Sequence, residues 1–398
     1  MFYKTIGVMV ILLLLLSSSS AREKSDFKTI SINTGSSCCC LDKAGNVDCS
    51  EIEEPDISDI TRLIDNLYIS HEELCCLEEA DVNGSGDYPD ISDITAIIDH
   101  LYLSHKEPGD CSSIIDKCCF GQRSPGLTAR IFYEEILSLN KVPHGQLAIS
   151  PDCSEIFWSG IVNGGPWETI YFTYFNGVNF TTPEIASFAL PDGDDHGPSF
   201  SCDGTKIFFT SIRPTPGYPG NPEGVWYVVR TDSGWSDPIP IEVTLDTLWY
   251  VMNPSVSRNG NLYFSAVQRG GFYPRIYCCK YVNGEYSEPE IIPGMINITP
   301  DLMDACVDPD EKYILFQSMS VPGYVGNSDL YISYLKPDST WGEPINLGIA
   351  INTKHFERFP SISPDGLHLF FIRAVGTIYI TANPKYYWIN AEILNQLK

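Results

Sequence analysis

The stretch PSISPDGLHLFFI, residues 360–372, contains the pattern that decides the fold of this chain. It places Pro364, Asp365 and Gly366 between two short apolar segments, and these residues favour a tight turn because proline fixes φ and glycine allows positive φ. Related stretches occur four more times upstream. Spacings of 51, 56, 51 and 55 residues separate the equivalent positions Ser150, Ser201, Ser257, Asp308 and Ser363. A period near 50 with several short strands per repeat is typical of a β-propeller.

Further strand signals follow each turn, so a repeat is expected to contain four strands. In the fifth repeat we expect the third strand at GTIYITAN from Gly376, and no fourth strand follows it. The segment ARIFYEEILSLN from Ala129 is similar to the missing strand. We therefore expect it to complete the last blade and close the ring, which removes open sheet edges. Five blades are predicted, with six as the alternative.

The pattern PSxSPDGxxLxF, followed by DLYxS and WxEPxxL, resembles the TolB-type, WD-repeat-like propeller family over residues 129–398. The resemblance implies a mainly β fold. It does not select a function, because propellers serve as scaffolds, binding modules and enzyme domains. The tryptophans of this region are expected to pack between blades rather than to stack on sugars. They are Trp158, Trp167, Trp226, Trp235, Trp249 and Trp341.

The N-terminal part of the chain differs in composition from the repeats. Lys4, an apolar run at 6–16 and the small residues at 19–21 predict a signal peptide over residues 1–21, so the protein is expected to be secreted, periplasmic or associated with the cell surface. A polar linker follows at 22–40. No later stretch is long enough for a membrane span. A hinge rich in glycine, serine and proline is expected at 120–128.

Charge and cysteine content narrow the possible partners. The formal net charge of −26 argues against a nucleic-acid partner, which needs clustered Lys and Arg. Nine of the fourteen cysteines lie between Cys38 and Cys119. In an exported chain this predicts disulfides that staple a small domain over residues 41–119.

That small domain contains a duplicated segment. PDISDITRLIDNLYISH from Pro55 and PDISDITAIIDHLYLSH from Pro89 differ at only four of seventeen positions. Apolar residues at helical spacing predict an amphipathic helix in each copy. Asp59 and Asp93 lie at the helix starts, where free backbone N–H groups favour a carboxylate.

Oxygen-bearing side chains precede both helices at alternate positions. The clearer set lies before the second helix, around Gly86, and alternation on a tightly turned loop directs such oxygens toward one hard cation. This set contains Asp81, Asn83, Ser85, Asp87 and Asp93. A weaker counterpart before the first helix contains Asp48, Ser50 and Asp59. We expect Ca²⁺ binding, more strongly in the second loop.

These loop–helix repeats resemble a dockerin, the duplicated calcium-binding module of secreted polysaccharide-degrading assemblies. The resemblance covers about 65 residues of the chain. It implies calcium-dependent tethering to a protein partner such as a cohesin. Ile57-Ser58 and Ile91-Ser92 replace the Ser-Thr pair common in dockerins that bind type I cohesins.

Residues just before the innermost strand of each blade are expected to line the mouth of the axial channel, together with His144 and Asp194. They are Asp195, His196, Tyr250, Asn253, Asp301, Asp304, Glu357 and Arg358. Two acids there, such as Asp195 and Glu357, could act as the acid and base of glycoside cleavage. We expect instead that they satisfy backbone groups at turns.

The combined pattern predicts an exported, non-enzymatic binding or scaffold protein. Its propeller would present a protein-interaction face, and its dockerin-like module would provide the tether. The alternative is a carbohydrate-binding or carbohydrate-active propeller delivered to a polysaccharide-degrading complex.

Overall fold

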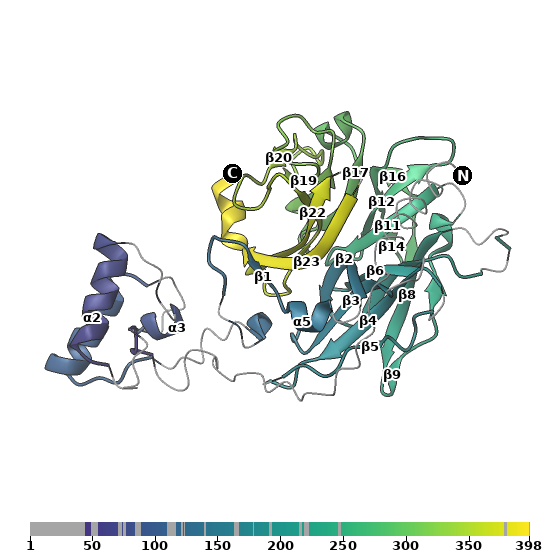
Figure 1. Cartoon of the computed structure of the whole chain (residues 1–398). Coiled ribbons are helices and arrows are strands. Elements are labelled where there is room, and N and C mark those ends of the chain that lie inside the picture. Colours follow the sequence, from purple (N-terminus) through teal and green to yellow (C-terminus); the bar gives the residue numbers. More distant parts are fainter. Residues whose placement is uncertain are drawn as a thin grey trace, which may run out of the picture. The chain divides into compact units, whose positions relative to one another are not determined.

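The computed structural model describes residues 44–48, 55–70, 74, 77–83, 89–109, 117–120, 122, 124–138, 141–162, 167–177, 179–190, 193–214, 217–218, 223–245, 248–377 and 380–397. They form two compact units that divide between Ser124 and Pro125, within the segment predicted as a hinge (Figure 1). The predicted signal peptide and linker lie outside the described residues. Among the described helices, none is long and apolar enough to cross a membrane.

The larger unit is a five-bladed β-propeller, as predicted. Each blade is a four-stranded antiparallel sheet. Blade 1 contains β2 (Lys141–Ile149), β3 (Glu155–Val162), β4 (Glu168–Tyr174) and β5 (Glu184–Ile185). Blade 2 contains β6 (Asp195–Phe200), β7 (Lys206–Ser211), β8 (Gly224–Thr231) and β10 (Ile239–Pro240), and β9 (Gly234–Trp235) also pairs with β8.

The other three blades repeat this arrangement. Blade 3 contains β11 (Leu248–Val256), β12 (Leu262–Gln268), β13 (Arg275–Cys279) and β16 (Glu290–Ile291), with an added hairpin of β14 (Tyr281–Val282) and β15 (Glu285–Tyr286). Blade 4 contains β17 (Leu302–Val307), β18 (Tyr313–Ser318), β19 (Asp329–Tyr334) and β20 (Ile345–Asn346). Blade 5 contains β21 (Phe356–Ile362), β22 (His368–Thr377), β23 (Ile380–Asn390) and β1 (Arg130–Ile131).

Strand β1 closes the ring, which confirms the prediction that the N-terminal strand completes the last blade. Arg130 lies opposite Trp388 and Ile131 opposite Tyr387, and Figure 1 shows β1 beside β23. The predicted third strand at GTIYITAN is wrong, however. β22 extends to Thr377 and pairs back onto β23, with Gly376 opposite Thr381 and Thr377 opposite Ile380, so β23 is the third strand. Four short helices are also described in this unit: α5 (Glu134–Leu137), η5 (Glu242–Thr244), η6 (Met295–Ile298) and η7 (Ala391–Leu397). The turn η4 (Lys117–Cys119) belongs to the smaller unit.

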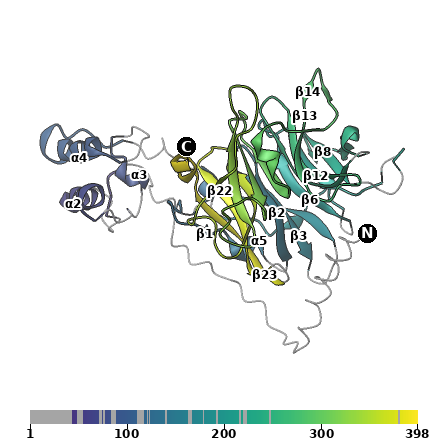
Figure 2. The ribbon, with the colours of Figure 1, turned by 90° about the horizontal axis from the view of Figure 1, so that it is seen from above.

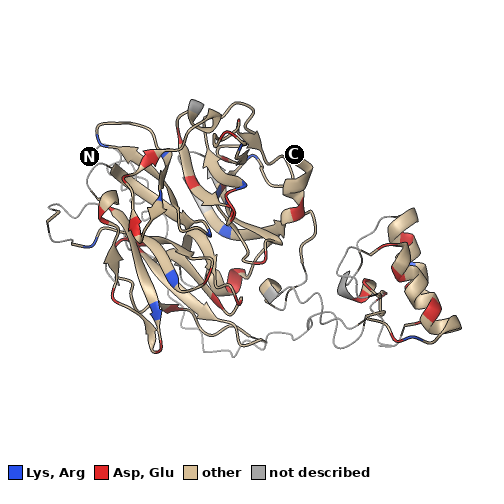
Figure 3. Cartoon of the chain, turned by 180° about the vertical axis from the view of Figure 1, so that it is seen from behind, with Lys and Arg blue, Asp and Glu red and all other residues tan. Residues whose placement is uncertain are grey.

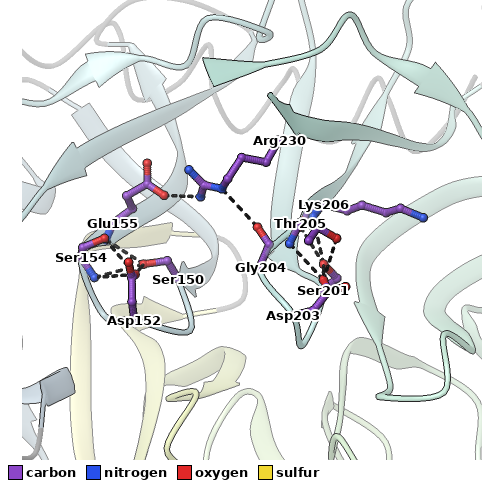
Figure 4. Close-up of polar contacts among 10 residues, drawn as sticks. All are labelled: Ser150, Asp152, Ser154, Glu155, Ser201, Asp203, Gly204, Thr205, Lys206 and Arg230. Carbon is purple, nitrogen blue, oxygen red and sulfur yellow. Dashed lines mark hydrogen bonds and ion pairs between the residues drawn. The ribbon is translucent and has the colours of Figure 1, made fainter. Parts of the chain in front are cut away.

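The aspartate of the repeated turn makes hydrogen bonds within its own turn. Ser201 Oγ donates to Asp203 Oδ1 at 2.6 Å, and the same oxygen accepts from Thr205 N at 3.0 Å. Ser150 and Asp152 repeat this bond in blade 1 (Figure 4). The aspartate thus satisfies backbone and hydroxyl groups of its own turn, as such residues commonly do.

The apolar core lies between neighbouring blades. Separate buried clusters join blades 1 and 2 around Phe157, blades 2 and 3 around Phe264, blades 3 and 4 around Phe316, and blades 4 and 5 around Phe371. Large side chains fill the wedge between twisted sheets, and each contributes through the apolar surface it buries. The packing therefore links the blades around the ring.

The smaller unit is a duplicated helical hairpin. α2 (Ile57–Ile64) continues as η1 (Asp65–Ile69), and α4 (Ile91–Ile98) continues as η2 (Asp99–Leu103). α2 and α4 contact each other and lie side by side in Figure 2, and α3 (Leu77–Ala80) precedes the second copy. Their inward residues, including Leu63, Ile94 and Ile97, form one buried cluster. Asp56 and Asp90 cap the helices in matching capping boxes.

Candidate functional site

The five inner strands surround the propeller axis. Each contacts the next, and β21 contacts β2. In every blade the register between the inner and second strands shifts near the middle of the inner strand. A residue with positive φ lies at each shift: Gly145, Gly197, Asn253, Asp304 and Phe359. Because bulges re-aim the neighbouring side chains, these positions control which polar groups meet at the axis.

A set of charged and polar side chains gathers where the inner strands begin. We call it the axial cluster: His144, Glu168, Asp194, His196, Glu223, Asn253, Asp304 and Arg358. His144 Nδ1 lies 2.9 Å from Glu168 Oε2, and His196 Nε2 lies 3.4 Å from Glu223 Oε1. The backbone N–H of Glu168 donates to Asp194 Oδ1 at 3.3 Å. The side chains of His144 and Arg358 are 34% and 29% exposed, so a ligand can reach the cluster.

Opposite charges fix the ionisation of two members. Burial alone would raise the pKa of Glu168, but the charges of His144, His196 and Arg358 outweigh it and lower that pKa to about 2. Burial would lower the pKa of His196, but its bond to Glu223 and the nearby carboxylates raise it to about 10. At neutral pH the cluster therefore contains an imidazolium between carboxylates.

The raised pKa of His196 gives a testable pH dependence. A protonated histidine that gains partners on folding stabilises the fold fully below its unfolded pKa near 6.5, and this contribution disappears as pH rises toward 10. We expect His196→Gln to lower the free energy of unfolding at pH 6 and to converge with the wild type near pH 10. Urea unfolding at several pH values measures this. A difference that is constant over the range would contradict the assignment.

The other half of the axis is held by amides and one buried carboxylate. Asn253 Nδ2 donates to Asp304 Oδ1 at 2.6 Å, which joins blades 3 and 4. Gln146 Nε2 donates to Pro198 O at 3.1 Å and to Pro254 O at 2.9 Å, so one amide joins blades 1, 2 and 3. Burial raises the pKa of Asp304 although Arg358 lies 4.0 Å away. These hydrogen bonds hold the inner strands of blades 1 to 4 together beside the axial cluster.

Two of the predicted mouth residues occupy different places from those expected. Asp195 is fully buried and pairs with Arg213 Nη2 at 2.5 Å, and Glu357 is fully buried and pairs with Arg373 Nε at 2.7 Å. Glu357 also accepts from the backbone N–H of Thr353 at 3.0 Å. Neither carboxylate is accessible to a ligand, so Asp195 and Glu357 cannot act as the acid and base of glycoside cleavage.

The other predicted mouth residues lie in or beside the inner strands. His196, Asn253, Asp304 and Arg358 belong to the axial cluster. Asp301 precedes β17, and its carboxylate accepts from Met319 N at 3.3 Å. Tyr250 lies in β11 with positive φ. The prediction placed these residues just before the strands; most lie inside them, because the strands begin upstream of the bulge.

Glu168 and Glu223 are members that the sequence reasoning missed. The first and third strands of a blade are parallel, since each is antiparallel to the second, and so both start at the same face. Glu168 begins β4 and Glu223 directly precedes β8. An acidic residue at the start of a third-strand signal could therefore have been assigned to the mouth.

Exposed aromatic residues of blades 1, 3 and 4 lie at strand ends on this face of the ring. Trp167 directly precedes β4, Trp249 lies near the start of β11, and the others lie in loops that lead into third strands. Their exposed fractions are 44% for Trp167, 46% for Trp249, 77% for Phe272, 57% for Tyr273 and 62% for Tyr324. We call these five residues the aromatic rim. Trp158, Trp226 and Trp341 are buried between blades as expected, but the expectation is wrong for Trp167 and Trp249.

In the helical unit the predicted calcium ligands converge around the two helix starts. Asp93 is buried; its Oδ1 accepts from Asn83 N at 3.1 Å and its Oδ2 from Asp90 N at 2.8 Å. Burial and the charge of Asp81 raise the pKa of Asp93. Asp59 repeats this arrangement with Asp48 N at 2.9 Å. Ser50, Ser85 and Asp87 lie outside the described residues.

Glu79, at the end of α3, was not predicted and adds a carboxylate beside the first loop. Its Oε2 accepts from Asn46 N at 3.0 Å. Each loop contains one buried carboxylate with a raised pKa, Asp59 in the first and Asp93 in the second, and a hard cation bound nearby would favour its charged form.

Comparison with known proteins finds likeness at the level of the fold. No family model matches the sequence, and no curated protein matches it. TolB from Acinetobacter baumannii is 15% identical with a TM-score of 0.40, over 62% of this chain and 54% of that one, so the chain spans about half of its length. A thermostable family-43 glycoside hydrolase is 13% identical with a TM-score of 0.42, over 62% and 88%. A GH43 endo-arabinanase from Bacillus licheniformis is 12% identical with a TM-score of 0.39, over 63% and 96%. The likeness therefore includes both TolB and family-43 glycoside hydrolases.

Proposed function

We propose that this protein is an exported, non-enzymatic binding or scaffold protein. Its propeller presents the axial cluster and the aromatic rim to a protein partner, and its helical unit acts as a calcium-dependent tether to a second, cohesin-like partner. The observation that carries the proposal is the gathering of exposed aromatics and partly exposed charges on one face of the ring.

The composition of this face supports a protein ligand. Protein interfaces are enriched in Trp, Tyr and Phe, and their strongest contacts are aromatic or arginine side chains surrounded by weaker ones. Phe272 and Tyr273 are among the most exposed large side chains described, and Arg358 is accessible in the centre. The surplus of acidic over basic residues, visible in Figure 3, favours a partner with a basic segment.

Affinity capture with the full-length protein tests this proposal. The bait is offered envelope proteins and, separately, insoluble polysaccharides. We expect a protein to be retained by the wild type and lost with Phe272→Ala/Tyr273→Ala. The matched control is Val282→Ala, in the β14–β15 hairpin, whose side chain is 60% exposed. Equal retention of the partner by the double variant and by the control would show that this face does not bind it.

The tether rests on calcium binding at Asp48 and Asp59 and at Asp81 and Asp93. Calcium takes six to eight oxygen ligands, and the buried carboxylates supply the charged ones. When bound, it would supply positive charge that holds each loop against its helix start. The exposed residues Ile57 and Ile91, at 66% and 62%, lie at equivalent positions of the two helices and would contact the partner.

Removal of calcium is expected to lower the stability of the helical unit. A ligand that binds only the folded state stabilises it by RT ln(1 + [L]/Kd), about 2.7 kcal/mol at a hundredfold excess over Kd. We expect the melting transition of this unit in the full-length protein to rise with calcium and fall with chelator. Asp93→Asn should remove most of the increase and Asp310→Asn, on the propeller surface, none. A melting transition that is the same with calcium and with chelator would show that this unit does not bind calcium.

A carbohydrate ligand is the second candidate, and the exposed rings of Trp167 and Trp249 favour it because flat aromatic faces can stack on sugars. Glu168 is ionised whereas burial raises the pKa of the neighbouring Asp194, the kind of contrast that acid–base pairs require. Retention on insoluble polysaccharide that depends on Trp167 and Trp249 would support this candidate. Release of reducing sugar that is lost in Glu168→Gln would make it an enzyme.

A further inference from the structure

The repeated turn serves as an internal reference, because the same positions occur in five blades. The residue after the turn serine, or after Asp308 in blade 4, is Pro151, Pro309 or Pro364 in three blades, but Cys202 in blade 2 and Arg258 in blade 3. The next position is aspartate in four blades and Asn259 in blade 3. A residue that differs from its equivalents in the other blades is not required to form the blade. Several such residues that lie close together therefore indicate a function other than folding.

These departures do meet. A cavity of about 300 Å³ lies between the turns of blades 2 and 3, on the side of the ring opposite the axial cluster. Its lining includes all three departures together with a lysine and two tyrosines. These residues are Cys202, Lys206, Arg258, Asn259, Tyr281 and Tyr286.

Lys206 supplies a cation to this cavity. Its position in the repeat is Glu155 in blade 1 and His368 in blade 5. Its Nζ lies 5.2 Å from the ring centroid of Tyr227 and 5.8 Å from that of Tyr281, and among the described residues it has no carboxylate partner. Figure 4 shows its side chain extending away from Arg230 and Glu155, which pair with each other. Its charge is therefore available.

Arg258 supplies a second cation, and nearby acids do not cancel it. Its Nε donates to Asp310 Oδ1 at 2.9 Å, which leaves the two Nη groups for another acceptor. Asp203 borders the cavity, but its Oδ1 accepts from Ser201 Oγ and Thr205 inside the turn. Asn259 replaces the aspartate that the repeat would place at the other edge. Compared with the repeat, the cavity has Lys206 and Arg258 as added cations and Asn259 in place of an aspartate. Glu311, at the glycine position of the blade 4 turn, is held by Ser257 and Asn261.

We propose that this cavity binds a small oxyanion, a carboxylate or phosphate group, between Lys206 and Arg258, with the rest of the ligand packed against Tyr281 and Tyr286. Arginine and lysine are the donors that recognise such groups, arginine through paired N–H bonds. The volume holds one small acid or a single charged group of a larger molecule. This site is independent of the function assigned to the opposite face.

Titration of the full-length protein at low salt with benzoate and with inorganic phosphate tests the site. We expect saturable binding that weakens as salt is added. Loss of a charged hydrogen bond costs about 1.5 kcal/mol or more, so Lys206→Met and Arg258→Gln should each weaken binding about tenfold. Lys336→Met, at an exposed lysine just after β19 in blade 4, is the matched control and should leave binding unchanged.

Cys202 provides a second readout at the site itself. Its thiol is partly exposed, whereas Cys278 and Cys279 are buried. We expect bound anion to slow alkylation of Cys202 by iodoacetamide, followed by peptide mass spectrometry. Binding of benzoate alone identifies a carboxylate ligand and binding of phosphate alone a phosphate; both support the site. Equal binding of neutral benzamide, unchanged affinity in both variants, or no protection of Cys202 would overturn it.

Discussion

Asp195→Ala is expected to destabilise the propeller by about 3–5 kcal/mol, the cost of leaving one partner of a buried ion pair alone. Asp195 has no exposed side-chain surface, and Arg213, its partner at 2.5 Å, is only 10% exposed. The same carboxylate oxygen accepts from Leu190 N at 2.7 Å. Removing it leaves the buried Arg213 guanidinium without its countercharge and the N–H of Leu190 without this acceptor. Thermal unfolding should show a melting temperature lower by roughly 10 °C.

A double-mutant cycle distinguishes the stability lost through the uncompensated charge of Arg213 from the stability lost through packing. Asp195→Ala/Arg213→Met removes both charges, so it should be more stable than Asp195→Ala alone. Asp310→Ala is the surface control, because its carboxyl is 45% exposed between Arg258 and Lys312 and should change stability by at most about 1 kcal/mol. A double variant no more stable than the single one would show that the pair is not the source of the loss.

Asp195 also shows which features of the axial residues can be predicted from the sequence. The sequence places Asp194, Asp195 and His196 just before an inner strand, whereas β6 begins at Asp195 and contains His196. Successive side chains of a strand point to opposite faces, so only one of two neighbours can reach the axis. His196 joins the axial cluster and Asp195 enters the wall. Glu357 and Arg358 divide in the same way in blade 5. Choosing between them needs the strand register, and a shift of one residue reverses it.

The elements that could be predicted are those with a repeated local signal. The turn, the blade count and the missing fourth strand all follow from motifs that occur several times. The third strand of blade 5 has no second copy of its hairpin for comparison, and there the apolar run at Gly376 was mistaken for a strand of its own. The cavity beside Lys206 involves two blades at once, so no single repeat reveals it.

Ring closure depends on a very short strand, which makes its anchor residue a second sensitive position. β1 pairs with β23 over only Arg130 and Ile131, and the backbone N–H of Phe132 adds a bond of 2.9 Å to Tyr386 O. Phe132 itself is fully buried. Its ring centroid lies 4.9 Å from that of Phe370 and 5.2 Å from that of Trp388. The side chain therefore contributes more to closure than the few backbone bonds.

Phe132→Ala is expected to cost about 3–5 kcal/mol, the range for removing a buried phenylalanine side chain. Ile131→Ala, whose side chain is 40% exposed, should cost less than about 1 kcal/mol. Hydrogen exchange then distinguishes closure from general loosening: amide protection should fall first in β23 and β22, whereas β7 and β12 keep theirs. A uniform loss in all five blades, or equal effects of the two variants, would mean that β1 does not hold the ring closed.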